Sequence, residues 1–200
     1  MPSGTYYLRS LGLLEGLPEG AGRLLEQYWR VERFGRGQVV FRQGEPAEQV
    51  YLLAEGMVEL VRCEEGKEVI LQLLTPGELI FGPSPAPAAG YPTQARAMGE
   101  CIVCAIGHRD LETVIQSIPG LGWRLLTWST RSTEEAYARI QALASCDVPD
   151  KLLALIRHLA GRHGVPTEEG LRISLRLTHH ELAALIGSCR EAVSRGLKAL

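Results

Sequence analysis

The chain has 200 residues, a formal net charge of −2 and 46% apolar residues, which suits one large or two small globular domains with a real core. No stretch is long and apolar enough to span a membrane, and no basic region followed by an apolar run opens the chain, so we expect a cytoplasmic protein. Its five cysteines are scattered and odd in number, which argues against a disulfide framework.

The first half of the chain is predicted to be all-β, preceded by a short helix over residues 24–30. Between Phe34 and Gly107, short apolar runs are separated by turn residues, at the spacing of a small antiparallel sandwich or barrel. The runs are residues 38–41, 49–54, 57–62, 68–74 and 101–106.

This half also contains a proline-rich segment and a pair of nearby cysteines. Residues 82–92 contain four prolines and are predicted to form a loop, either the rim of a pocket or a plain surface excursion. Cys101 and Cys104 form a C-x-x-C pair, but residues three apart on a strand point to opposite faces. We therefore expect both cysteines to be buried and not to share a metal ion.

Residues 110–144 are predicted to be helical, with a break near Pro119 and Gly120. Leu121, Leu125 and Trp128 begin one apolar stripe, while Thr133, Tyr137 and Ile140 offer a second apolar face. Two such faces fit a helix that packs on its own sandwich and on a partner subunit. A single buried helix in a monomer is the alternative.

Asp147, followed by Pro149, has the pattern of a helix N-cap with proline in the first turn, and we interpret it as a hinge. The next helix has an apolar face and ends around residues 161–166. Its apolar residues are Leu152, Leu155, Ile156 and Leu159. We divide the chain into residues 1–110, 111–146 and 147–200.

The charge is unevenly distributed along the chain. From Val148 onward, eight basic side chains face five acidic ones, a net charge of +3, whereas the preceding residues carry a net charge of −5. Four of the five histidines also lie in this C-terminal part. This asymmetry favours the C-terminal part as the one that meets phosphates.

Residues 171–177 alternate between apolar and polar and are predicted to form a strand with one buried and one cationic face. Thr178 and Glu181 have the spacing of a capping box, which begins a helix, and Gly187 supplies a tight turn. Ser188 and Glu191 repeat the cap pattern for a second helix. Two short capped helices around one glycine indicate a helix-turn-helix.

The second helix has two distinct sides. Val193, Leu197 and Leu200 are predicted to hold it against the first helix, and the opposite side is polar. Arginine can bind guanine O6 and N7 as a bidentate pair, and glutamate can accept from cytosine N4. The polar side offers Arg190, Glu191, Ser194 and Arg195. A solvated salt-bridge ladder on a surface helix is the alternative interpretation.

The order of these elements resembles the CRP/FNR family of bacterial transcription regulators, over nearly the whole chain. The most specific parts are Gly44-Glu45, residues 50–56 and 58–60, the Pro76-Gly77-Glu78-Leu79 turn, and residues 143–148 and 177–200. The resemblance implies an α+β fold with an N-terminal cyclic-nucleotide-binding-like β-sandwich (jelly roll), a long dimerisation helix and a C-terminal winged-helix-type helix-turn-helix domain. It implies a non-enzymatic homodimer whose partners are double-stranded DNA and RNA polymerase.

Carried onto this sequence, Arg190, Glu191 and Arg195 match the base-reading positions of the family, and this trio implies a half-site resembling TGTGA. His179, Ser188, Cys189 and Lys198 lie near positions that meet phosphates. In the family, two such helices contact half-sites about 34 Å apart. Family members continue into a β-hairpin wing, whereas this sequence stops at Leu200. We expect either a truncated form or an absent wing, with weakened DNA affinity.

The family pattern of the effector site is altered. Cyclic-AMP-binding members use an arginine and a serine for the phosphate, and alignment places Tyr91 and Pro92 there; Ala136 and Tyr137 replace a threonine-serine pair that meets the adenine. Gly77 and Glu78 remain, so a pocket would involve Gly77, Glu78, Tyr91 and Tyr137. We expect no response to cyclic AMP and no metal or cofactor.

Other interpretations have less support in the residues. An iron–sulfur or haem sensor of this family lacks its ligands, because the first cysteine is Cys63 and the sandwich has no histidine before His108. An enzyme on a β-barrel would need converging histidines or carboxylates. A regulator that acts through an effector or protein contacts, with a weakened DNA-binding domain, stays open. Cys189, beside Arg190, is a candidate for oxidation that blocks DNA contact.

Overall fold

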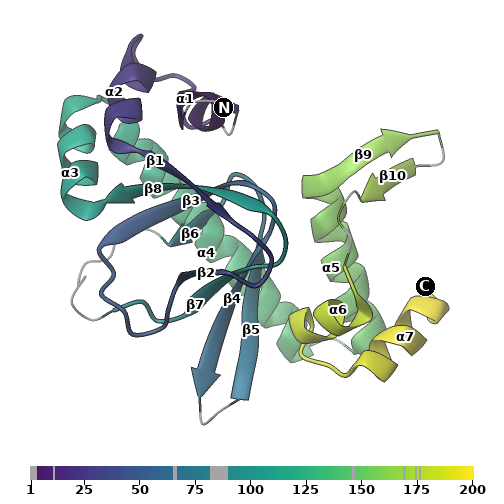
Figure 1. Cartoon of the computed structure of the whole chain (residues 1–200). Coiled ribbons are helices and arrows are strands. Elements are labelled where there is room, and N and C mark those ends of the chain that lie inside the picture. The colour runs from purple at the N-terminus through teal and green to yellow at the C-terminus, as the bar shows by residue number, and fades with distance from the viewer. Residues whose placement is uncertain are drawn as a thin grey trace. The chain divides into compact units, whose positions relative to one another are not determined.

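The computed structural model divides into two compact units, Met1–Ser132 and Thr133–Leu200, which are described separately (Figure 1). It describes residues 4–10, 12–64, 67–81, 90–145, 147–168, 170–173, 175 and 177–200. Within these residues, no helix combines the length and apolar character needed to cross a bilayer.

The first unit is a sandwich of two four-stranded antiparallel sheets with helices on one side, the jelly-roll arrangement expected from the sequence. Two helices precede it, α1 (Gly4–Ser10) and α2 (Ala21–Tyr28). The first sheet has the order β1 (Arg30–Phe34), β8 (Cys101–Gly107), β3 (Gln49–Glu55), β6 (Leu79–Phe81). The second has the order β2 (Val39–Phe41), β7 (Gln94–Ala97), β4 (Val58–Glu64), β5 (Lys67–Leu74).

Strand β8 shows why one apolar run in the sequence has no polar alternation. Its residues Cys101, Val103 and Ala105 belong to the core between the two sheets. Residues Ile102, Cys104 and Ile106 belong to a second core, formed where helices cover the outer face of the first sheet. The two cysteines therefore face opposite sides and are buried, as predicted, and burial raises the pKa of each thiol to about 11.

The five predicted runs correspond to strands β2, β3, β4, β5 and β8. Strands β1, β6 and β7 were not predicted, because they are short and obtain their place from pairing with β8, β3 and β4. The predicted helix over residues 24–30 ends at Tyr28, and Arg30 already begins β1 opposite Ala105. Residues 82–89 of the predicted loop lie outside the described residues.

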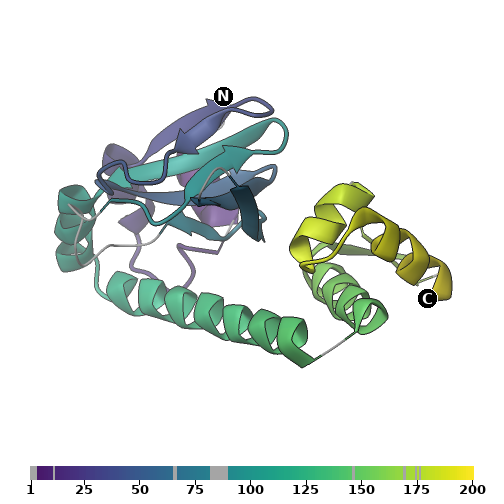
Figure 2. The same cartoon turned by 90° about the horizontal axis from the view of Figure 1, so that it is seen from below.

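Helices α3 (His108–Ser117) and α4 (Leu121–Ser145) follow the sandwich, and the predicted break at Pro119 and Gly120 is confirmed by the positive φ of 87° at Gly120. Leu121 and Leu125 are buried in the outer core, and Trp128 packs against it. Figure 2 shows α4 as one long continuous helix.

The second unit continues with α5 (Val148–His163), β9 (Gly164–Thr167), β10 (Gly170–Ile173), α6 (His179–Leu185) and α7 (Arg190–Ala199). The Asp147 side chain accepts from the backbone N–H of Asp150 at 3.1 Å, which confirms the predicted N-cap of α5. Leu152, Ala183, Ile186 and Val193 bring α5, α6 and α7 together in one core.

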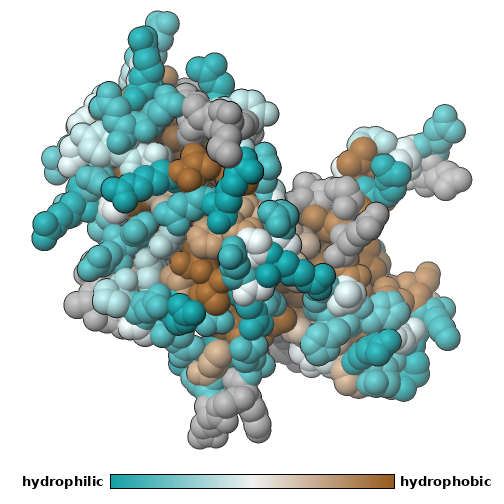
Figure 3. Space-filling view, viewed as in Figure 1, coloured by the Kyte–Doolittle hydropathy of each residue, from teal (hydrophilic) through white to brown (hydrophobic). Residues whose placement is uncertain are grey.

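The strand predicted over residues 171–177 is shorter than expected. It ends at Ile173 in β10, whose partner β9 was not predicted. Leu171 is 60% exposed, so the expected buried face is wrong at this residue. The physical reason is that β10 pairs with β9 in a two-stranded ribbon, where Figure 3 shows a small brown, apolar area among hydrophilic surface.

The turn between β3 and β4 contains a glycine that is packed closely against the backbone, and substitution tests this contact. Gly56 and Gly44 share a φ of 83°, but a Cβ on Gly56 would lie 2.4 Å from the Glu100 carbonyl oxygen, whereas nothing lies within 4 Å at Gly44. We expect Gly44→Ala to cost roughly 1–2 kcal/mol from backbone strain alone. We expect Gly56→Ala to cost about 3 kcal/mol or more in urea unfolding. Equal losses in the two variants would contradict the close approach.

Candidate nucleic-acid interface

Helix α6 begins with the capping box that the sequence predicts. The Thr178 hydroxyl accepts from the backbone N–H of Glu181 at 3.2 Å, and the Glu181 carboxylate accepts from the backbone N–H of Thr178 at 2.6 Å. The helix ends in a glycine turn, where Gly187 has a φ of 62° and the Ser188 N–H donates to the Ala183 carbonyl at 2.9 Å. This turn sets the direction in which the second helix leaves.

The predicted second capping box is wrong. The N-cap of α7 is Cys189, and it makes no side-chain cap hydrogen bond. Ser188 takes part in the turn that ends α6 and lies one residue before the N-cap of α7. Ser188 and Glu191 therefore have the spacing of a capping box but do not occupy its positions.

Glu191 lies in the first turn of α7 and is held in its ionised form. Its pKa is lowered by a hydrogen bond from its own backbone N–H, next by the Cys189 side chain, and further by the charges of Arg190 and Arg195. An ionised carboxylate only accepts hydrogen bonds, which matches the role predicted for this residue.

The inner side of α7 is packed closely on α5. Val193 is fully buried, and a Cβ on Gly196 would lie 2.6 Å from Leu152 Cδ1, so the absence of a side chain at Gly196 allows the approach. Leu200 is 57% exposed, so its predicted place on the inner side is wrong. Gly196 was missed by the sequence reasoning, although a glycine inside a helix is a signal of close packing.

The outer side of α7 brings together most of the predicted DNA-contacting residues. Arg190, Glu191, Arg195 and Lys198 are exposed along it, and Ser194 is half-buried among them. The His179 ring joins this side, because its Nδ1 lies 2.8 Å from Ser194 Oγ. Ser188 and Cys189 lie immediately before the helix, half-buried and exposed respectively.

Of the four residues predicted around an effector, Gly77, Glu78 and Tyr91 lie in the first unit and Tyr137 lies in the second. Gly77, with a φ of 91°, and Glu78 form the turn before β6, and the Glu78 carboxylate accepts from the Thr75 N–H at 2.6 Å and from its hydroxyl at 2.5 Å. Tyr137 belongs to the second unit and is 67% exposed.

Tyr91, the fourth of these residues, fills space inside the sandwich. Its ring is buried and stacks on Phe41 with 4.0 Å between centroids, next to Tyr51. Its hydroxyl lies 3.2 Å from both the backbone N–H and the carbonyl of Gln49, donating to the latter. Burial is the main cause of the raised pKa of the Tyr91 phenol, which therefore stays neutral.

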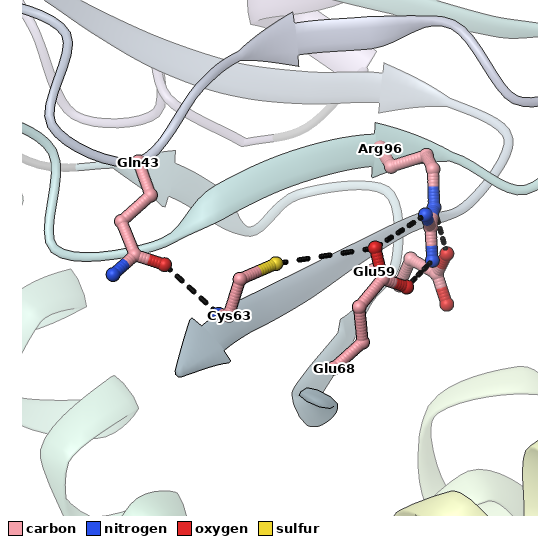
Figure 4. Close-up of polar contacts among 5 residues, drawn as sticks. All are labelled: Gln43, Glu59, Cys63, Glu68 and Arg96. Atoms are coloured by element: carbon pink, nitrogen blue, oxygen red, sulfur yellow. Dashed lines mark hydrogen bonds and ion pairs between the residues drawn. The ribbon is translucent and has the colours of Figure 1, made fainter. Parts of the chain in front are cut away.

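A charged network on the sandwich joins three neighbouring strands (Figure 4). Arg96 points away from the inter-sheet core, since its neighbours Ala95 and Ala97 are buried in that core. Its Nε lies 2.5 Å from Glu59 Oε1, and its Nη2 lies 3.0 Å from Glu68 Oε2, so one guanidinium joins β7, β4 and β5. These bonds raise the arginine pKa, and they occupy both carboxylates. Across the described part of the chain, no three histidines, cysteines or acidic residues are placed to hold a metal ion.

Comparison with known families gives one match for each part of the chain. Residues 31–118 match the model of the cyclic nucleotide-binding domain, and residues 150–200 match that of the Crp-like helix-turn-helix domain. Together with curated relatives that are 30–31% identical over most of the chain, these matches show that the chain belongs to the CRP/FNR family. It is therefore a transcriptional regulator with a helix-turn-helix DNA-binding domain, not an enzyme.

Curated relatives extend over most of the chain. It is 30% identical to the cyclic AMP receptor protein of Thermus thermophilus, over 94% of this chain and 84% of the relative. It is 29% identical to a CRP-like cAMP-activated global transcriptional regulator of Mycobacterium tuberculosis, over 95% and 85%. The global nitrogen regulator of a Synechocystis strain is 31% identical, over 82% and 75%.

Solved structures share the fold. The c-di-GMP-responsive global regulator of Xanthomonas campestris superimposes with a TM-score of 0.71 at 22% identity, over 91% of both chains. The catabolite activator protein of Thermus thermophilus gives a TM-score of 0.55 at 30% identity, over 94% of this chain and 85% of that structure.

Proposed function

We propose that this regulator binds a pseudo-palindromic, TGTGA-like DNA site as a homodimer and does so independently of cyclic AMP. The observation that carries the proposal is the orientation of α7: Val193 and Gly196 are buried on its inner side, and Arg190, Glu191 and Arg195 are exposed on the other. RNA polymerase is a further proposed partner, on the ground of family membership.

The chemistry of the exposed side of α7 suits base edges in a major groove. The two arginines can each bind guanine O6 and N7 in bidentate fashion, and the ionised Glu191 can accept from cytosine N4. His179, Ser188, Cys189 and Lys198 surround this side with donors suited to phosphate oxygens. The base-reading trio would supply specificity, and the surrounding donors would supply register and salt-dependent affinity.

The homodimer is supported by an apolar stripe along α4 that extends the one expected from the sequence. The residues follow one another at intervals of three and four, the spacing of a two-stranded coiled coil. Trp123, Leu126, Tyr137 and Ile140 in this stripe are 74%, 55%, 67% and 62% exposed. Large apolar side chains in such a row favour association with a second helix. The α4 stripe consists of Trp123, Leu126, Thr130, Thr133, Tyr137 and Ile140.

Independence of cyclic AMP is supported by Tyr91. This residue stands where cyclic-AMP-binding relatives carry the phosphate-binding arginine, and its ring is already packed between sheet residues and hydrogen-bonded to Gln49. A neutral phenol engaged in this way offers no positive charge to a phosphodiester. The curated relatives themselves are named for different signals, cyclic AMP and nitrogen.

The DNA-binding proposal is tested by selecting bound sequences from random duplexes at a stated salt concentration. We expect a TGTGA-like palindrome. Arg190→Ala and Arg195→Ala should each weaken binding to it about ten- to a hundredfold and relax preference at one base position. Lys198→Ala is the matched control and should weaken all sequences alike while reducing the salt slope by about one. Selection without a palindrome, or identical behaviour of the three variants, would contradict the proposal.

The dimer is tested by placing a charge in the α4 stripe. Ile140→Glu would bury a carboxylate between two helices, so we expect analytical ultracentrifugation to show a monomer and DNA affinity to fall with it. Gln141→Glu introduces the same charge at the adjacent exposed position, off the stripe, and should leave the dimer intact. A dimeric Ile140→Glu protein would place the interface elsewhere.

The absence of a cyclic AMP response is tested by isothermal titration of the nucleotide into the protein. We expect no binding heat up to millimolar nucleotide, because the arginine charge is missing and Tyr91 occupies the interior. The cAMP-activated relative from Mycobacterium tuberculosis serves as the positive control. A micromolar dissociation constant for this chain would refute the expectation.

A further inference from the structure

One side-chain hydrogen bond joins the two helices of the helix-turn-helix at the DNA-facing side. His179, the first residue of α6, places its Nδ1 2.8 Å from the Ser194 Oγ of α7. Ser194 follows Arg190 by four residues and Glu191 by three, so it is their neighbour on the same helical face. The imidazole is thereby held beside the proposed base-reading side chains.

The hydrogens of this pair depend on the charge of the ring. When Nδ1 of a neutral ring carries no hydrogen, the Ser194 hydroxyl donates to it, and Nε2–H is the single donor left for DNA. When the ring is cationic, Nδ1–H donates to Ser194 Oγ instead. The hydroxyl hydrogen is then released for an outside acceptor, beside a positively charged Nε2–H donor.

The surroundings link this protonation to DNA. Ser194 shares its side of α7 with the exposed Arg190, Glu191 and Arg195, so the imidazole is held beside charged side chains of both signs. Glu181 is occupied by its capping box with Thr178. Phosphates of a bound duplex would add negative charge and favour the cationic ring. Three helices pack in this core, and besides His179 they carry several charged and titratable groups among the described side chains. These are Arg190, Glu191, Arg195 and Lys198 on α7, His180 and Glu181 on α6, and Asp150, Lys151, Arg157 and His158 on α5.

We propose that His179 and Ser194 form a proton-linked pair in which His179 positions the Ser194 hydroxyl as a donor to DNA, so that the protein binds its site more tightly as the pH falls. The inference rests on the proposed DNA-binding function. Histidine is the side chain whose charge ordinarily changes between pH 5 and 8. Because the bound state takes up the proton, affinity rises on acidification by up to about tenfold per pH unit for each proton linked.

The first test measures binding of a rhodamine-labelled duplex carrying the selected site by fluorescence anisotropy, from pH 5.5 to 8 at constant ionic strength. We expect the dissociation constant of the wild-type chain to fall as the pH is lowered. His179→Gln keeps a polar group but cannot become charged, so its profile should be much flatter. His180→Gln, at the adjacent position of the same helix, is the matched control and should keep the wild-type slope. An unchanged slope in His179→Gln overturns the inference.

The second test asks whether Ser194 is part of the pair. Ser194→Ala should lose more affinity at pH 6 than at pH 8, since the released hydroxyl hydrogen exists mainly when the ring is charged. Ser194→Thr retains the hydroxyl and should recover most of the loss. A loss for Ser194→Ala that is the same at both pH values, or no recovery with Ser194→Thr, would show that His179 acts without Ser194 and would overturn the pair.

A readout without DNA separates the possible failures. Imidazole ¹H–¹⁵N spectra of the free chain should show that Ser194→Ala changes the tautomer populations of His179 and leaves those of His180 unchanged. Unchanged His179 spectra would overturn the pair. If no variant binds any duplex at any pH, the DNA-binding proposal fails and this inference falls with it. If binding persists and only the His179-dependent pH effect is missing, this inference fails alone.

Discussion

The surface that the second unit offers to a ligand depends on how closely α7 lies on α5. Val193 is fully buried, and Gly196 has no side chain that would clash with Leu152, so α7 packs closely on α5 through these two residues. This contact fixes the rotation of α7 about its own axis. Because an α-helix turns once every 3.6 residues, fixing Val193 and Gly196 inward points Glu191 and Arg195 outward and leaves Arg190 exposed at the edge of the same side. The chemistry of the outer side is thus a consequence of packing on the inner side.

In the sandwich, too, packing determines where the side chains lie, but here it places aromatic side chains in the interior. Strand β8 is covered on both faces, and Phe41, Tyr51 and Tyr91 stack in the core between the sheets. The outward Arg96 is already paired with two carboxylates of neighbouring strands. In the described part of the sandwich, these aromatic rings therefore pack against one another, and these charged groups pair with one another.

Local features could be predicted from the sequence, and features that depend on distant partners could not. The Thr178 and Glu181 capping box, the Asp147 cap and the break at Gly120 each involve residues within a few positions of one another, and all three were predicted correctly. Ser188 has the same local pattern but is engaged in the turn of the preceding helix. Leu171 is exposed because β10 pairs with β9 in a two-stranded ribbon. Tyr91 is buried by Phe41 and Tyr51, which are distant in the sequence, so no local pattern reveals its burial. The predicted site residues of α7 share a face, whereas the predicted effector residues are divided between the two units.

The apolar stripe on α4 and the polar side of α7 both affect the free energy of the proposed specific binding to DNA. A good bidentate contact to a base contributes about 1–3 kcal/mol of discrimination, so a single α7 with three base-reading side chains is limited to a few such increments. Specific regulators exceed their own non-specific binding by about 4–10 kcal/mol and must compete with a very large number of other sites. Joining two chains doubles the number of base contacts, and with it the available discrimination, without any new base-reading residue. Exposed Trp123, Leu126, Tyr137 and Ile140 would cost free energy on a monomer, and their burial in a dimer would hold two copies of α7 on one duplex. If the proposed function holds, the α4 stripe would contribute to specific DNA recognition together with Arg190, Glu191 and Arg195.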